Sequence, residues 1–196
     1  MSHIDDVSES DRATLAPIFE AVETSMGFVP NSFYAMAHWP ELLKSFTGFA
    51  GTVLGPGKID PGLKQLVAFV VSNAAGCRYC QAHTSHNANR LGITEEKIQA
   101  AFEFETSELF NDAERAALRV ALHAGMVPNA VEGAQFEALK EHYSDRQITE
   151  IVAVISLFGY LNRWNDTMAT SLEDKAINFA DRVLAPTGWQ GDKHLV

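Results

Sequence analysis

Residues 55–76, GPGKIDPGLKQLVAFVVSNAAG, decide the fold class. Asp60 is a natural N-cap, Pro61 suits the first position of a helix and Gly76 is a stop signal, so the stretch predicts a helix over about 61–75. Its apolar residues recur at helical spacing, and the same spacing returns along the chain. The sequence shows neither sustained strand-like alternation nor a hairpin dipeptide between alternating apolar runs. It therefore predicts an all-α protein.

Glycine, proline and capping residues divide the rest of the chain into further helices. Two pairs have the spacing of a capping box: Asn111 with Glu114, and Ser144 with Gln147. The tail after Ala185 is predicted to be a loosely held end. The further helices are expected at about 11–26 (capped by Ser10, stopped by Gly27), 32–38, 40–55, 77–91, a short one after Thr94, 112–124, 130–142 and 145–172.

Charge and hydropathy restrict the possible partners. The formal net charge of −10 and the pI near 5.1 disfavour binding to nucleic acid or to an anionic membrane, because either would be repelled. The start, MSHIDDVSESDR, has neither the basic nor the apolar region of a secretory signal. The longest apolar runs are too short to cross a bilayer. We therefore expect a soluble, cytoplasmic protein with no nucleic-acid or membrane partner.

The domain organisation is predicted to be a single all-helical domain over 1–196, with a core at about 60–92 and a second helical half at about 111–175. A weak internal similarity relates QLVAFVV at 65–71 to EIVAVIS at 150–156. If it records a repeat, Asn162 and Asn165 stand in the second copy where Cys77 and Cys80 stand in the first. Only one half would then carry thiol chemistry.

Residues 76–90, GCRYCQAHTSHNANR, place cysteine or histidine at every third position from 77 to 86. Two cysteines and two histidines are a familiar zinc ligand set. On a helix, however, a step of three residues turns by about −60°, so Cys77, Cys80, His83 and His86 would spread over about 180°. The four groups cannot all face one tetrahedral ion; three of them could do so if Cys77 lies in the turn before the helix, and a fourth ligand would then have to come from elsewhere. The sequence therefore predicts no metal.

The two cysteines leave packing and redox chemistry as alternatives. A lone buried cysteine often only fills space. Two in a C-x-x-C at a helix start lie within disulfide reach, and the helix N-terminus stabilises a thiolate there. His83 follows Cys80 by three residues and is placed to exchange a proton with its sulfur, whereas His86 lies a further turn away and is expected at the surface. The pattern favours a redox pair, Cys77 and Cys80.

These residues also carry a family resemblance. The stretch LKQLVAFVVSNAAGCRYCQAHTSH resembles the core of the alkylhydroperoxidase D (AhpD)-like branch of the carboxymuconolactone decarboxylase family. The flanks MGFVPNSFYAMAHWPELL, FNDAERAALRVALHAGMVPNAV and YSDRQITEIVAVISLFGYLNRWND resemble the group of peroxidase-related proteins. The resemblance covers about residues 15–175 and implies an all-helical bundle that assembles as a dimer, trimer or hexamer. It also implies a peroxidase reaction without a bound cofactor.

The resemblance assigns roles by position. It implies that Cys80 is the peroxidatic thiol, that Cys77 is the resolving thiol and that His83 is the relay base. Two positions depart from the family pattern: its histidine falls at Thr84, and its glutamate falls at Gln65, which can form hydrogen bonds but cannot take a proton at neutral pH.

Two further residues are possible parts of a relay or pocket. The internal similarity aligns Glu150 with Gln65, so Glu150 could replace the missing glutamate if the fold brings it close. It could equally cap a helix or lie on a helix surface. Arg163, with Asn162, could line the pocket or form hydrogen bonds between helices.

The expected function is that of a thiol-dependent peroxidase of the peroxiredoxin type. Cys80 would attack a hydroperoxide, the sulfenic acid would condense with Cys77, and an external dithiol would restore the pair. The alternatives are a dithiol–disulfide oxidoreductase with little peroxidase activity and a non-enzymatic redox-sensing homo-oligomer.

Overall fold

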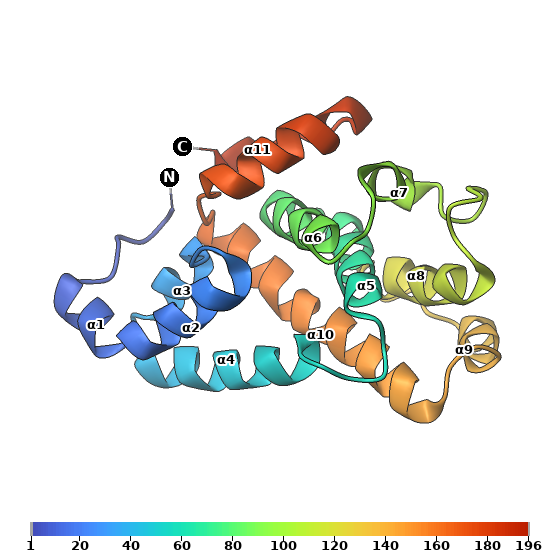
Figure 1. The fold of residues 1–196 in the computed structure, drawn as a ribbon, viewed down its shortest axis with the longest axis horizontal. Coiled ribbons are helices and arrows are strands. Elements are labelled where there is room, and N and C mark those ends of the chain that lie inside the picture. Colours follow the sequence, from blue (N-terminus) through green and yellow to red (C-terminus); the bar gives the residue numbers. More distant parts are fainter. Residues whose placement is uncertain (1, 196) are drawn as a thin grey trace.

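A computed structural model describes residues 2–195, and helices are the only regular structure in that range, which confirms the all-α prediction (Figure 1). Short 3₁₀ turns lie at Ala100–Phe102, Ala185–Thr187 and Asp192–His194. The α-helices are α1 (Glu9–Thr14), α2 (Ala16–Met26), α3 (Asn31–Met36), α4 (Pro40–Leu54), α5 (Pro61–Ala74), α6 (Arg78–Arg90), α7 (Glu95–Gln99), α8 (Asp112–Ala124), α9 (Gly133–Lys140), α10 (Asp145–Met168) and α11 (Asp174–Val183).

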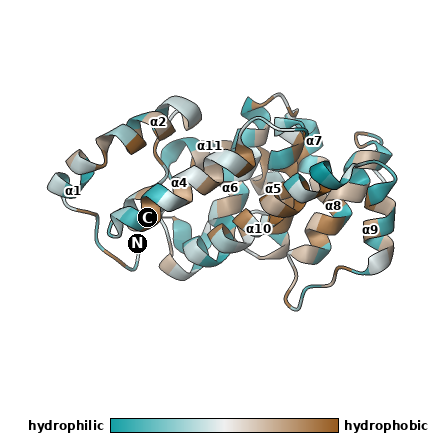
Figure 2. Ribbon diagram, turned by 90° about the horizontal axis from the view of Figure 1, so that it is seen from below, coloured by the Kyte–Doolittle hydropathy of each residue, from teal (hydrophilic) through white to brown (hydrophobic). Residues whose placement is uncertain are grey.

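The centre of the molecule is the hairpin of α5 and α6. These two helices pack closely on each other, and α8, α10 and α11 pack around them. Figure 1 shows α10 crossing diagonally past both, with α1 to α4 on one side and α7 to α9 on the other. Apolar residues concentrate on α5, α8 and α10 (Figure 2). Nearly every residue of α5 between Gly62 and Ser72 is buried, so its continuous apolar run is explained by contacts on all sides.

Local capping explains where the helices begin. The Asp60 carboxylate accepts the backbone N–H of Leu63 at 3.0 Å, as its position before α5 predicted. Both predicted capping boxes form, at the starts of α8 and α10. Helix starts were predictable because a cap needs only residues within one turn of each other.

The first predicted helix is wrong in detail, because the segment 11–26 forms two helices that meet at Leu15. Pro17 stands in the first turn of α2, where a missing N–H costs nothing, whereas a continuous helix would lose a hydrogen bond there. The helix predicted to reach 172 also ends early, at Met168, because Ala169 adopts a left-handed conformation (φ 49°).

The tail after Ala185 is not loosely held, contrary to the prediction. Trp189 is buried and donates its indole N–H to the carbonyl of Arg78 at 3.3 Å. His194 is fully buried, and its carbonyl accepts the N–H of Leu172 at 2.8 Å. The sequence shows few apolar residues in this segment, so only the tertiary packing reveals that it covers the start of α6.

Across residues 2–195, every helix is too short or too polar to span a lipid bilayer.

Candidate active site

The C-x-x-C segment stands at a break between two helices. Gly76 takes a left-handed conformation (φ 77°), which a residue with a Cβ adopts only at a cost. This turn makes Cys77 the N-cap of α6, and the Cys77 sulfur accepts the backbone N–H of Cys80 at 3.4 Å. The free N–H groups and positive dipole end of α6 therefore face the Cys77 sulfur.

Both thiols are free and enclosed by protein. Cys77 is 0% and Cys80 is 2% exposed. The side-chain amide of Asn165, on α10, donates to the Cys80 sulfur at 3.5 Å. Burial raises the pKa of the Cys80 thiol, the neighbouring Cys77 sulfur raises it further, and the Asn165 hydrogen bond opposes both effects. Cys80 is therefore a neutral thiol at neutral pH.

His83 lies in a different contact from the one the sequence predicted. Its Nε2 lies 2.5 Å from Oε2 of Glu173, the residue at the N-cap position of α11. Within the described residues, its ring has no hydrogen bond to either thiol. His83 also stacks on Tyr79, with ring centroids 4.3 Å apart, and the Tyr79 hydroxyl donates to Oε1 of Glu173 at 2.9 Å. The histidine is thus held by a carboxylate and a phenol.

Glu173 is the site residue that sequence reasoning missed. Burial alone would raise the pKa of its carboxyl, but the charge and hydrogen bond of His83, the backbone N–H of Asn31 and the hydroxyl of Tyr79 together lower it. Glu173 is therefore a carboxylate at neutral pH. It lies 90 residues after His83, and its only local signature is a position before a helix, so the sequence carried no signal for this contact.

The two other candidates for a relay group lie elsewhere. Glu150 accepts the backbone N–H groups of Lys58 and Ile59 and forms ion pairs with Arg146 (2.9 Å) and Lys64 (3.5 Å). Burial would raise the pKa of Glu150, but these donors and charges lower it to about 2. The contacts of this carboxylate therefore join the loop before α5, the first turn of α5 and the start of α10. Gln65 faces a groove beside α2 and α4 and has no hydrogen bond to a thiol.

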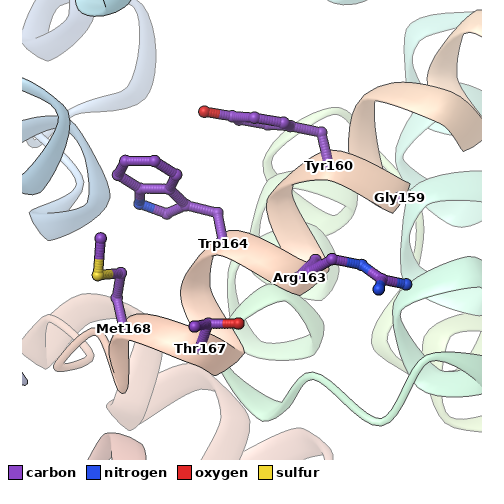
Figure 3. A pocket seen from close by; sticks show the side chains of 6 residues that line it. All are labelled: Gly159, Tyr160, Arg163, Trp164, Thr167 and Met168. Carbon is purple, nitrogen blue, oxygen red and sulfur yellow. The ribbon is translucent and has the colours of Figure 1, made fainter.

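His86 and Arg163 are also separate from the thiols. His86 is half-buried between the rings of Phe28 and Phe179, and its pKa is lowered by burial and by the nearby charge of Arg90. Arg163 is exposed on α10 and lines a small hollow with Tyr160 and Trp164 (Figure 3). Figure 3 shows the Arg163 side chain extending away from the two aromatic rings. The structure therefore groups neither residue with the pair.

The C-terminal segment encloses the start of α6. Besides the indole of Trp189, Asp192 pairs with Arg78 at 3.5 Å, and His194 lies beside Tyr79 with ring centroids 5.9 Å apart. The surroundings of the pair thus come from α6, α10, α11 and the tail. Over residues 2–195, the histidine, cysteine and carboxylate side chains do not gather in threes as a metal site would require.

Comparisons with known proteins agree with this architecture. Residues 40–123 match the model of the carboxymuconolactone decarboxylase family. The uncharacterized protein YnjA of Escherichia coli (strain K12) is 31% identical over 142 residues, which cover 72% of this chain and 73% of that protein.

Three solved structures, of two proteins, are similar over almost their full length. The apo structure of the debrominase Bmp8 shares 36% identity over 93% of this chain and 98% of its own, with a TM-score of 0.86. A second Bmp8 structure, with one cysteine replaced by alanine, contains 2,3,4-tribromopyrrole. An AhpD-core, peroxidase-related protein from Ralstonia eutropha JMP134 has a TM-score of 0.78 at 24% identity, over 89% of this chain and 94% of its own, which shows the same fold.

Proposed function

The chain belongs to the carboxymuconolactone decarboxylase family, and from this premise we propose that it is a cysteine-pair reductase with hydroperoxides as its first substrate class. The observation that carries the proposal is the position of Cys77 at the N-cap of α6, with Cys80 one turn on and both thiols free. A pair so placed can give up two electrons and close a disulfide.

The geometry favours Cys77 as the attacking sulfur, the reverse of the assignment that the resemblance implies. The Cys77 sulfur accepts an N–H at the positive end of a helix, which stabilises a thiolate. Cys80 has a raised pKa, and the histidine that was expected to take its proton is bound to Glu173. Cys80 is then suited to be the resolving thiol.

The reaction has two steps and consumes one pair of electrons. The Cys77 thiolate attacks the terminal oxygen of the hydroperoxide; the S–O bond forms while the O–O bond breaks, and the alkoxide takes one proton and leaves as the alcohol. The Cys80 sulfur then attacks the sulfenic acid of Cys77, and the hydroxide leaves with the Cys80 proton as water. An external dithiol reduces the resulting disulfide and is itself oxidised to a disulfide.

The Glu173, His83 and Tyr79 network supplies a proton path beside this pair. Glu173 holds the ring of His83, and Tyr79 packs on that ring. A carboxylate that orients an imidazole can prepare it to act as a general acid, so His83 is proposed to protonate the departing alkoxide.

A second candidate reaction is the reductive removal of bromide from an aromatic ring. The observation that favours it is the 36% identity to the debrominase Bmp8 across 98% of that chain, together with the bromopyrrole in its cysteine-to-alanine variant. The overall balance is the same: two thiols become a disulfide, the carbon–bromine bond becomes carbon–hydrogen, and one bromide and one proton are released.

The test measures turnover with excess dithiothreitol and three substrates: hydrogen peroxide, cumene hydroperoxide and 2,3,4-tribromopyrrole. Loss of hydroperoxide over many equivalents per chain, abolished in Cys77→Ser, supports the peroxidase. Release of bromide while both hydroperoxides remain unreacted supports the debromination reaction in place of the peroxidase reaction. Oxidation that stops after one equivalent overturns both in favour of a redox sensor, and thiols that react with none of the three overturn the reductase.

A further inference from the structure

A groove beside the last turns of α6 is not used by the thiol chemistry. It lies between α2 and α4, with α5 and the last turns of α6 as its floor, and has a volume of about 730 Å³. This volume falls in the range of small-molecule sites. Most of its lining is apolar, from Ile18 and Val22 on α2 to Ala50 and Leu54 on α4.

Two glycines on α4 keep the groove open. Gly48 and Gly51 stand three residues apart and both line it, and a Cβ built on either would meet no atom within 4 Å. A glycine inside a helix is less favourable than an alanine there. Here that cost has no packing reason, because a Cβ would fit at either position without a clash. The two positions therefore preserve empty space.

One buried polar side chain lines the groove without a partner. Gln65 is 7% exposed, and the described residues offer its Oε1 no hydrogen-bond donor. An enclosed acceptor left unpaired destabilises the folded protein, so buried amides normally have hydrogen-bond partners. The terminal torsion of a glutamine side chain is soft, so the carboxamide can turn toward a molecule in the groove. Its oxygen calls for a hydrogen-bond donor.

The charges at the groove indicate an uncharged ligand. Arg90 is the charged residue of its lining, and its guanidinium already donates to the carbonyls of Ser25 and Met26. Gln65 carries no charge to balance an ion. A mostly apolar lining with one buried, unpaired acceptor fits a neutral molecule that presents a donor to Gln65.

We infer that this groove is a binding site for a neutral, ring-sized apolar molecule with a single N–H or O–H donor, which Gln65 accepts. The site stands apart from the cysteine pair, on the opposite end of α6, about 10 Å along the helix from Cys80 to Asn87 at 1.5 Å per residue. Its existence does not depend on the proposed reduction.

The probes are indole and indene, which have nearly the same shape but differ in the N–H donor. Titration calorimetry should show indole binding to the wild-type protein at up to millimolar concentration, about tenfold tighter than indene. Gln65→Leu should remove this preference, because the acceptor is lost while the volume is kept. An unchanged preference in that variant, or no indole binding to the wild type, would overturn the inference.

The groove itself is tested by filling it. Gly51→Leu should weaken the binding of both probes by about tenfold or more, whereas Thr52→Leu, with the same side chain one position away on an exposed face outside the lining, should leave it within about twofold. Equal binding by Gly51→Leu and the wild type would contradict the site. Gly48→Leu is the second filling variant, to be used if circular dichroism shows that Gly51→Leu has lost its helical fold. The Cys77→Ser, Cys80→Ser double variant should bind indole normally, so a failed reductase leaves this test intact.

Discussion

The hairpin of α5 and α6 and the single long helix α10 contain similar runs of residues and place different chemistry after them. In the first, QLVAFVV at 65–71 is followed by Cys77 and Cys80; in the second, EIVAVIS at 150–156 is followed at the same spacing by Asn162 and Asn165. The first helix stops at Ala74 and a new one begins, whereas α10 continues to Met168. The break gives the cysteines a helix N-terminus, and the asparagines lie inside a helix without one.

The two regions also meet in space. Asn165 donates to the Cys80 sulfur, so the second segment supplies a partner to the first. Their leading positions differ as well: Gln65 is unpaired in a groove, and Glu150 is surrounded by donors and cations. A helix break, rather than the residues before it, distinguishes the segment that holds two thiols at a helix N-terminus from the segment that continues as one helix.

The largest effect should come from removing a thiol. Cys77→Ser should reduce turnover with dithiothreitol by about 10³-fold or more, because the attacking sulfur is gone. Cys80→Ser should also stop turnover but still form one sulfenic acid on Cys77, which dimedone would trap and mass spectrometry would locate. A dimedone adduct on Cys80 in the Cys77→Ser variant would reverse the two roles and restore the order that the family resemblance implies.

The next effect concerns Gln65 and Glu150, the first residues of the two similar runs. Glu150→Gln should lower the free energy of unfolding by about 2–3 kcal/mol at pH 7, since Lys64, which is 2% exposed, loses its carboxylate partner. The control, Gln65→Leu, should not lower stability, because its carboxamide has no hydrogen bond to lose and leucine removes an unpaired buried acceptor. Urea unfolding measures both. A larger loss in the control would show that the groove position is structural.

This effect has a pH dependence with a definite sign. The folded pKa of Glu150 is lowered from 4.5 to about 2, so its contribution is fully present above pH 4.5 and is lost as the pH falls toward 2. The stability difference between wild type and Glu150→Gln should therefore shrink over that window. A difference that stays constant down to pH 3 would mean that the carboxylate contributes through shape and not through charge.

A smaller effect is expected at the contact between the two regions. Asn165→Leu removes the hydrogen bond to Cys80, so the pKa of that thiol should rise further and disulfide closure should slow by about tenfold, equivalent to about 1.4 kcal/mol. Alkylation of Cys80 at a series of pH values reports the pKa. Asn162→Leu is the matched control, because both polar atoms of Asn162 lack a partner within the described residues. Equal shifts in the two variants would remove Asn165 from the site.

The smallest effect is expected from comparing the glycine at the break between α5 and α6 with a glycine inside the continuous helix α10. Gly76→Ala should destabilise the protein by about 1 kcal/mol, because alanine must adopt the left-handed conformation of the turn. Gly159→Ala, inside α10 with no atom within 4 Å of the new Cβ, should stabilise it by about 0.5–1 kcal/mol. Thermal unfolding gives both signs. A stabilising Gly76→Ala would show that the break does not depend on glycine.

Local chemistry in the sequence determined the fold class, most helix starts and the position of the C-x-x-C. A cap, a capping box or a glycine stop acts within a few residues. The structure therefore has the helix boundaries that the sequence predicted at Asp60, at Gly76 and at the boxes of Asn111 and Ser144. The family resemblance rested on the same contiguous stretch. These features do not require knowledge of what packs against them.

Tertiary structure alone decided the partners of the site. Glu173 contacts His83 from 90 residues away in the sequence, and Asn165 contacts Cys80 from 85 residues away. Glu150, the carboxylate that the internal similarity indicated, instead binds the backbone of Lys58 and the ammonium group of Lys64. Each contact depends on which helix faces meet, and many faces in this chain are equally apolar. Hydrophobic burial is non-directional, so the spacing of apolar residues predicts that a helix is buried but not which side chains it will bring together.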